Sequence, residues 1–261
     1  MKKLLFLTAI VSLLFVGCNN DNENYDPNDP SRETVRLLPL RIWYGDSGIT
    51  FEHDEFNRLI RMFDSGSDSN RNTIAYNAQH NPVVLRQVHR NFTGEIYETV
   101  TTFQYHNNQV LIARNNGSTQ YDTLTINANG SLEEMRSHNL VERYFYNTAG
   151  DLILIERITR RWDGSTTTNF IHIDYSDVKS IFRHQNAPNW FRVWFWRNDI
   201  ELFVGLYHMP SSIRGLSDGD GNMSFSYELD ADGYVRQMHI VNEEQWGTSS
   251  VTAIIEYVPA R

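Results

Sequence analysis

The feature that most constrains the fold is a turn-and-strand pattern that recurs along the chain of 261 residues. Each copy starts with an aromatic or aliphatic anchor, continues with Asn or Asp and a short turn, and ends in a β-rich stretch. Asn, Asp and Gly accept the positive φ that tight turns demand, so these residues fall between strands. The pattern therefore predicts consecutive β-hairpins. The clear copies are 76–85, 126–135 and 146–155, and the looser copies are 51–60, 105–112, 175–181 and 227–235.

The stretches between turns alternate in the manner of strands. In 152–159, Leu152 and Leu154 are expected on one face and Ile153 and Ile155 on the other. The anchors from Phe51 to Tyr175 recur every 20 to 29 residues, which fits two strands of about 8–11 residues and two turns per unit. We therefore predict one all-β domain over 35–261, an antiparallel meander of hairpins curled into a roll or a barrel-like sheet.

The repeats resemble two kinds of known protein. The units look like the tyrosine-aspartate repeats of wall-associated and toxin-shell proteins. Over roughly 36–258, the chain resembles a family of uncharacterised lipoproteins from gut bacteria, including at Met209-Pro210-Ser211-Ser212-Ile213 and at 227–234. That resemblance implies a porin-like β-fold. The family has no established activity, so it implies no catalytic residue.

The amino terminus has the form of a lipoprotein export signal. Lys2 and Lys3 precede an apolar run over 4–16, which is too short to span a bilayer. The run ends in Gly17-Cys18, resembling the lipobox of bacterial lipoproteins, although Phe15 stands where that family prefers Leu. Cys18 is the only cysteine, so it has no disulfide partner within the chain. We predict cleavage after residue 17 and lipidation of Cys18; the alternative is an ordinary secretory signal with an incidental cysteine.

The segment after the cysteine is expected to act as a spacer. Residues 18–34 are rich in Asn, Asp and Pro and predict a flexible, acidic, lipidated tether. Asn19 differs from the aspartate that favours inner-membrane retention, so the resemblance implies the outer membrane. The acidic residues also resemble the export tags of surface lipoproteins, which predicts a cell-surface location. The periplasmic face is the alternative.

Charge narrows the choice of partners. Removal of residues 1–17 takes two lysines, so the mature charge is 21 − 32 = −11 with neutral histidines. No basic run is present, which argues against nucleic acid and anionic membrane surfaces as partners. An inserted barrel needs an unbroken apolar band on its lipid face. Charges such as Glu156 and Arg157 occur on both faces of the expected strands, so we expect the membrane contact to be the lipid anchor.

The longest interval between anchors, 175–227, contains the most aromatic stretch of the chain, 190–197. Read as a strand, it places four side chains on one face: Trp190, Arg192, Trp194 and Trp196. These residues are the candidate ligand-binding set, because tryptophan faces stack on sugars and peptides and pair with guanidinium groups. The alternative is a central strand buried on both faces.

Motifs of catalysis and metal binding are weak. Gly215-Leu216-Ser217-Asp218-Gly219 fits the G-x-S-x-G pattern, but no helix is expected after it, so it does not predict a nucleophile elbow. The turn 218–222 spaces oxygens as a calcium loop does, without the glycine and glutamate that such a loop requires. His172 and Asp174 share a strand face but carry no further sign of catalysis. We expect no enzyme, metal site or cofactor.

Three functions are compatible with this sequence. The leading one is a non-enzymatic binding or scaffolding module for extracellular glycan or peptide. The alternatives are a carrier of a hydrophobic ligand inside the curled sheet and a polysaccharide hydrolase. A carrier predicts a large apolar cavity, a glycan binder predicts accessible aromatic faces, and a hydrolase predicts two converging carboxylates.

Overall fold

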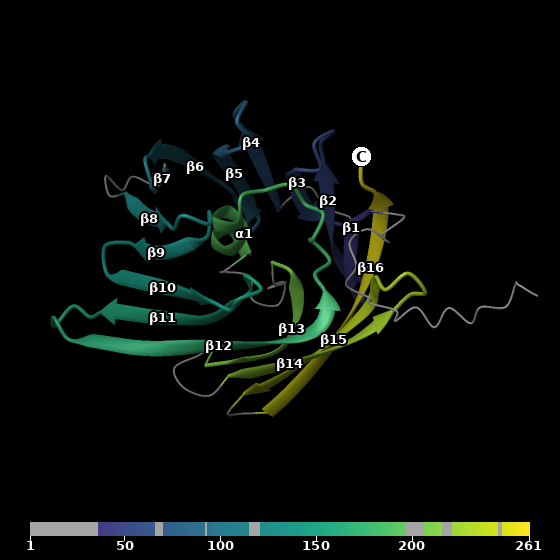
Figure 1. Cartoon of the computed structure of the whole chain (residues 1–261). Helices are drawn as coiled ribbons and strands as arrows, with labels where there is room; N and C mark the ends of the chain where they lie inside the picture. Colours follow the sequence, from purple (N-terminus) through teal and green to yellow (C-terminus); the bar gives the residue numbers. More distant parts are fainter. Residues whose placement is uncertain are drawn as a thin grey trace, which may run out of the picture. The chain divides into compact units, whose positions relative to one another are not determined.

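The described residues form a closed antiparallel β-barrel with one helix inside it (Figure 1). The computed structural model describes residues 36–65, 70–91, 93–114, 121–196, 206–215, 221–244 and 247–261. Its strands confirm the predicted all-β class and meander order. The elements are β1 Leu37–Tyr44, β2 Ser47–His53, β3 Leu59–Asp64, β4 Arg71–Tyr76, β5 Pro82–Arg90, β6 Ile96–His106, β7 Gln109–Arg114, β8 Asp122–Ile126, β9 Leu132–Arg136, β10 Leu140–Tyr146, β11 Leu152–Arg160, β12 Thr166–Lys179, α1 Asn189–Trp196, β13 His208–Arg214, β14 Asn222–Leu229, β15 Val235–Glu244 and β16 Gly247–Pro259.

The first and last strands close the barrel. Each strand pairs with its neighbour in sequence, and β1 also pairs antiparallel with β16, from Leu37 opposite Pro259 to Tyr44 opposite Ala253. The sequence pattern is compatible with both a roll and a barrel, and the pairing of β1 with β16 shows that the sheet is a barrel. Because each of the strands β1 to β16 has two neighbours, the sheet that the described residues form has no free edge.

Five turns at one end of the barrel are closed by the side chain of their first residue, an Asn or an Asp. In the turn 127–131, Asn127 N donates to Ser131 O, and Asn127 Oδ1 accepts from the backbone N–H groups of Asn129 and Ser131. Gly130 has a φ of 77°, which explains the glycine in the pattern. The same scheme closes the turns that start at Asp54, Asn77 and Asp230, and in the turn that starts at Asn147 the side-chain oxygen accepts from Asp151 N. We call this end of the barrel the Asx rim.

A β-bulge follows these turns and changes the predicted face of the return strand. Tyr146 pairs with Leu152 but Phe145 pairs with Leu154, so Ile153 is the extra residue. Leu152 and Ile155 are therefore both buried, at 1% and 4% exposure, whereas Ile153 is 38% exposed. The predicted alternation, with Leu152 and Ile155 on opposite faces, is wrong because it assumed a strand without a bulge.

A ladder of tyrosine hydroxyl groups joins the repeats near the Asx rim. Tyr146 OH, for example, donates to the carbonyl oxygen of Leu132 over 2.8 Å. In five of the six pairs the acceptor is the first residue of a return strand, and in the sixth it is the third residue of β13. The donor and acceptor pairs are Tyr76 and Leu59, Tyr105 and Pro82, Tyr146 and Leu132, Tyr175 and Leu152, Tyr227 and Pro210, and Tyr257 and Val235.

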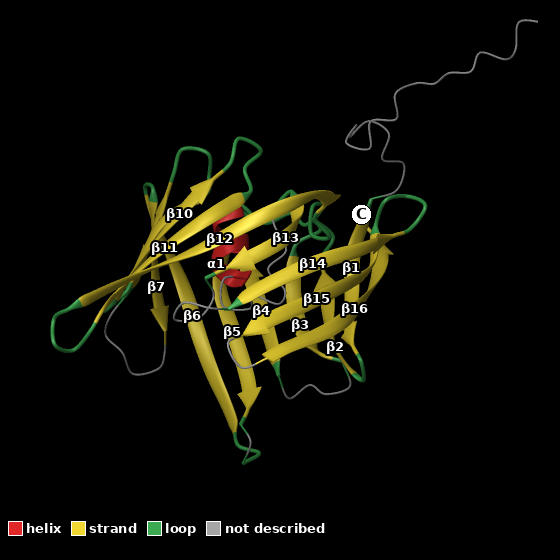
Figure 2. Ribbon diagram, turned by 90° about the horizontal axis from the view of Figure 1, so that it is seen from below, coloured by secondary structure: helices red, strands yellow, loops and turns green. Residues whose placement is uncertain are grey.

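The stretch expected as an aromatic strand is a helix, α1, which the strands surround (Figure 2). It lies on the connection from β12 to β13, and Phe191 stacks on Phe195 one turn later, with ring centroids 5.5 Å apart. The strand interpretation of 190–197 is therefore wrong. The side chains of α1 complete one hydrophobic core with the inward residues of the strands. No helix among the described residues is long and apolar enough to cross a membrane.

The outward faces of the strands carry ion pairs. Arg143 lies between Glu142 and Tyr144, which are 1% and 4% exposed on the inner side, so Arg143 points outward. It contacts Glu134 on β9 and Glu156 on β11, at 3.2 and 2.9 Å. Further pairs on outward faces are Arg41–Glu256, Arg61–Glu52, Arg86–Glu98 and Arg214–Asp174. Charge is thus distributed around much of the barrel exterior.

Candidate functional site

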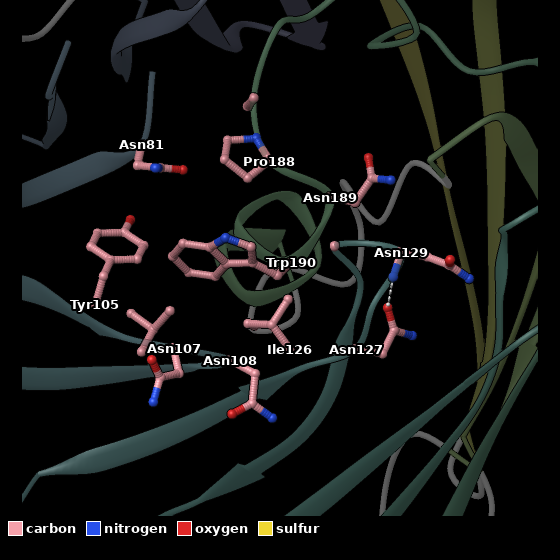
Figure 3. Close-up of a pocket in the computed structure, with 13 residues that line it drawn as sticks. Asn81, Tyr105, Asn107, Asn108, Ile126, Asn127, Asn129, Pro188, Asn189 and Trp190 are labelled. Atoms are coloured by element: carbon pink, nitrogen blue, oxygen red, sulfur yellow. Dashed lines mark hydrogen bonds between the residues drawn. The ribbon is translucent and has the colours of Figure 1, made fainter. Parts of the chain in front are cut away.

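A pocket of about 620 Å³ lies at the Asx rim, beside the start of α1 (Figure 3). Three turns contribute to it, those after β4, β6 and β8, together with the segment that leads into α1. We call it the asparagine pocket, because its lining includes Asn81, Asn107, Asn108, Asn127, Asn129 and Asn189. The volume is within the range of about 300–1,000 Å³ that is typical of ligand sites.

Several of the amide groups are free to bind a ligand. Asn127 uses its Oδ1 to close its own turn, and Asn189 Nδ2 donates to Tyr207 OH over 3.2 Å. The other four amides make no hydrogen bond within the described part of the chain; they belong to Asn81, Asn107, Asn108 and Asn129. A side-chain amide offers two N–H donors and an acceptor oxygen. The pocket thus presents donors and acceptors in close proximity.

Two aromatic rings form part of the lining. Trp190 and Tyr105 have centroids 6.1 Å apart and planes at 68°, and Figure 3 shows both side chains at the pocket. Trp190 is held from behind by Phe103, at 5.9 Å. Tyr105 is 36% exposed, and its hydroxyl donates to Pro82 O over 2.6 Å. Burial raises the pKa of Tyr105, with a smaller contribution from Tyr76, so its hydroxyl stays neutral near pH 7.

The start of α1 has few free donors to offer. Trp190 N donates to Gly130 O on the neighbouring turn, over 3.1 Å. The N–H groups of Phe191 and Arg192 both point to Pro188 O, at 3.0 and 3.1 Å. A helix N-terminus binds anions through such N–H groups when they are unpaired. These are already paired, so the helix gives the pocket no anion site.

The pocket is electrically neutral. None of the 13 residues that line it is acidic, basic or histidine. Glycoside hydrolysis uses a pair of carboxyl groups, and acid–base catalysis most often uses a histidine or a carboxyl group. Elsewhere in the described residues, no three His, Cys, Asp or Glu side chains lie in a metal-binding cluster. The arrangement can hold a ligand through hydrogen bonds and ring contacts, without an evident reactive group.

The predicted ligand-binding set is buried rather than displayed as a platform. Trp190, Arg192, Trp194 and Trp196 are between 3% and 6% exposed. Trp194 packs edge-on against Phe103 and Trp196 stacks on Phe182, with centroids 5.1 and 5.0 Å apart. The four do not share a face, because a helix turns each residue by about 100°. Trp190 alone of the four lines the asparagine pocket.

The side chain of Arg192 is bonded to the backbone of the barrel interior. Its Nη2 donates to the carbonyl oxygens of Phe182 and Leu206, over 3.2 and 3.0 Å. Burial lowers the pKa of this guanidinium to about 10, so it stays protonated at neutral pH. It joins the segments on either side of α1 and is not available for stacking on a ligand.

The remaining predicted sites are placed as follows. Cys18 lies outside the described residues. Residues 216–220 do too, and with them most of the G-x-S-x-G motif and of the calcium-like turn. His172 and Asp174 do share the outward face of β12. Asp174 accepts from Ser212 and Arg214, at 2.8 and 2.9 Å, which gives it a cross-strand role.

Sequence reasoning missed the asparagine pocket. The repeat pattern predicts that its asparagines form turns, as Asn127 does, and that Tyr105 anchors a strand, as it also does. The one sequence signal for the pocket was the cluster of asparagines at 107–108 and 127–129, where a tight turn requires fewer of them. That signal does not reveal that the turns lie next to the start of α1.

Comparison with known proteins gives relatives of low similarity. No family model matches the chain, and no curated protein is significantly similar to it. One solved structure that it matches is described as a porin-like protein from Bacteroides uniformis; identity is 17%, coverage is 85% of this chain and 95% of the other, and the TM-score is 0.40. Another is described as a porin-like protein from Bacteroides vulgatus, with 11% identity, 86% and 100% coverage, and a TM-score of 0.42.

Membership of the gut-bacterial lipoprotein family, and the tyrosine-aspartate character of the repeats, stay predictions. The closed all-β barrel is evident from the strand pairing of this chain itself. Function has to be inferred from its own residues.

Proposed function

We propose that the protein is a non-enzymatic binding module of the bacterial cell envelope and that the asparagine pocket is its ligand site. The observation that carries this proposal is the neutral pocket at the Asx rim, with four free amides beside Trp190 and Tyr105. Most ligand sites combine apolar and aromatic lining with a few well-placed polar groups, and this pocket has that composition. The ligand would be an extracellular glycan or a peptide.

The two alternatives receive less support. A hydrolase would need two carboxyl groups about 5–10 Å apart around the bond it cleaves, and the pocket lining has no carboxylate. A hydrophobic-ligand carrier would need an apolar cavity in the barrel. The space around α1 holds packed side chains, with Phe103 in ring contact with Trp190, Phe191 and Trp194. A binding module fits both observations.

The envelope location rests on the sequence and on the barrel exterior. We propose that a lipid on Cys18 and the tether over 18–34 hold the barrel at the outer membrane, on the cell surface. An arginine on the lipid face of an inserted barrel costs about 2–4 kcal/mol at the bilayer midplane. Outward ion pairs such as Arg143–Glu134 and Arg214–Asp174 therefore favour a barrel in water with a separate anchor.

The binding role can be tested by NMR on the purified barrel. Uncharged trisaccharides and blocked, uncharged tripeptides are titrated while the side-chain amide signals of Asn81, Asn108 and Asn129 are followed. Binding of any probe at these amides, with the probe recovered uncleaved, supports the proposal. It fails if no probe shifts these signals, or if a probe that binds there is hydrolysed.

The anchor can be tested by fractionation of cells. Cys18→Ala is expected to move the protein from the membrane fraction to the soluble fraction, because the barrel exterior is charged. Cys18→Ala protein that stays in the membrane after alkaline extraction would contradict the anchor and indicate insertion of the barrel. Arg143→Gln, with its cysteine intact, is the control and should stay in the membrane fraction.

A further inference from the structure

We propose that the asparagine pocket takes an uncharged saccharide segment in preference to a peptide or a charged ligand. This inference rests on the proposed binding function and makes its ligand specific. Four properties of the pocket support it: the free amides, the two rings, the absence of charge and the closed sheet around it.

The amides match the hydrogen-bonding groups of a sugar. Each hydroxyl group of a sugar is both a donor and an acceptor, and each side-chain amide is both as well. Asn107 and Asn108 lie on one turn and Asn129 on another, both at the pocket in Figure 3. A ring with hydroxyl groups along its edge can bond to both turns, while its C–H face remains for an apolar contact.

Tyr105 supplies that apolar contact, and Trp190, which is only 4% exposed, borders it. Tyrosine and tryptophan present an apolar body that a sugar ring can cover. Tyr105 is 36% exposed, and its hydroxyl is fixed by Pro82 O at the far end of the ring. Trp190 meets Tyr105 at 68°, so the two form a corner rather than a flat wall. A sugar ring can lie against the exposed face of Tyr105, and the edge of Trp190 limits how far it can turn.

The absence of charge selects against ionic ligands. A uronate, a sulfate or a phosphate would lose water at this site without gaining a cation, since no lining residue carries one. The first amide groups of α1 do not replace that cation, because Trp190 N is bonded to Gly130 O and Phe191 N to Pro188 O. An uncharged ligand has no such penalty.

The closed sheet selects against a peptide. Extended peptides bind many domains by adding a strand to a free sheet edge. Here β1 pairs with β16, so the barrel has no such edge. A terminal carboxylate or amine needs a counter-charge or a nest of free N–H groups. The residues that line the pocket provide neither.

Calorimetric titration of the purified wild-type barrel with defined probes tests this inference. The probes are the trisaccharides of glucose, mannose and xylose, a trisaccharide of galacturonic acid, and an acetylated, amidated tripeptide of serine. Asn129→Trp is expected to occlude the pocket at an exposed turn position. Asp232→Trp is the matched control, because Asp232 N bonds to Asp230 Oδ1 as Asn129 N bonds to Asn127 Oδ1, on a turn outside the pocket.

The expected result is that at least one neutral trisaccharide binds, and that Asn129→Trp weakens it by tenfold or more while Asp232→Trp does not. Asn108→Asp should weaken it by about tenfold, since a carboxylate of the same shape loses the amide donors. If the tripeptide or the galacturonate binds in the pocket and the neutral sugars do not, the saccharide inference is overturned and the binding function stands. If no probe binds, or Asn129→Trp has no effect, both are overturned.

Discussion

The hydroxyl group of Tyr175 donates a hydrogen bond to the backbone carbonyl of Leu152 over 2.8 Å, although 23 positions separate the two residues. Leu152 begins a return strand next to its β-bulge, where the ladder of backbone hydrogen bonds is interrupted. The tyrosine therefore satisfies a carbonyl group at the point where the sheet is irregular. Burial raises the pKa of Tyr175, so the hydroxyl keeps its proton over the physiological range.

Removal of that hydroxyl should destabilise the barrel. Tyr175→Phe keeps the ring and leaves Leu152 O without its donor, so we expect a loss of about 1–2 kcal/mol in the free energy of unfolding. Denaturation in urea at pH 7 measures it. Tyr121→Phe is the control at a tyrosine that is 55% exposed, and it should be neutral. Equal effects of the two variants would show that the ladder does not stabilise the barrel.

Asp151 joins two segments that are far apart in the sequence. Its carboxylate is fully buried and accepts from the backbone N–H groups of Tyr207 and His208, at 2.9 and 3.1 Å. His208 Nδ1 lies 2.6 Å from the other carboxylate oxygen. These contacts connect the turn after β10 to the beginning of β13, on the chain that returns from α1.

Asp151→Asn should therefore cost stability. The amide oxygen can keep the two backbone donors but accepts more weakly than a carboxylate, and an NH₂ group replaces the oxygen that contacts His208 Nδ1, so we expect a loss of about 2 kcal/mol. Thermal unfolding measures the change. Asp232→Asn, on an exposed turn, should leave the transition unchanged. A loss as small as that of the control would mean that the contacts of Asp151 are not needed to hold the connection.

Local chemistry explains which parts of the fold could be predicted from the sequence. The turns at 127–131 and 147–151 were predictable, since Asn127 and Asn147 close them through their own side chains. The bulge at Ile153 was not predictable, because it depends on the register in which the strand after the turn pairs with the strand before it. Pairing of β1 with β16 joins residues more than 200 positions apart and has no local signal.

The helix and the pocket depend on the closed barrel. Apart from Arg192 and Arg197, the run 190–197 is apolar, so its periodicity cannot distinguish a buried strand from a buried helix. The closed barrel leaves an interior to be filled, and α1 fills part of it. The pocket then arises where α1 meets turns from separate hairpins, as in the bond from Trp190 N to Gly130 O. The order of residues in the sequence does not reveal this contact between α1 and the turns.

Tryptophan fluorescence should separate the buried helix from the exposed turns. Trp194 is 5% exposed, whereas Trp162, on the turn between β11 and β12, is 99% exposed. In acrylamide quenching, Trp162→Phe should remove a large part of the quenchable emission. Trp194→Phe should reduce only the protected, blue-shifted part. If Trp194→Phe instead removes quenchable emission, α1 is accessible to solvent and the packed interior is wrong.

His53, at the end of β2, should make the stability depend on pH. Burial lowers its pKa to about 4, against a small opposing effect of Asp54, and its Nε2 is buried without a partner. The unfolded chain has a histidine pKa near 6.5, so between pH 6.5 and 4 it binds more protons than the folded chain. Stability is therefore complete above pH 6.5 and falls as the pH decreases to about 4, by at most about 3 kcal/mol.

Replacement of this histidine should flatten that part of the profile. His53→Leu removes the titrating group, so the free energy of unfolding should change less between pH 6.5 and 5.5, a range about one unit or more above the usual carboxyl pKa values of about 4. His239→Leu is the control, because His239 faces outward and contacts Thr252 Oγ1 at 2.8 Å. Urea denaturation over a pH series measures both. If His53→Leu keeps the slope of the wild type, another group is responsible for it and His53 is accessible to protons in the folded barrel.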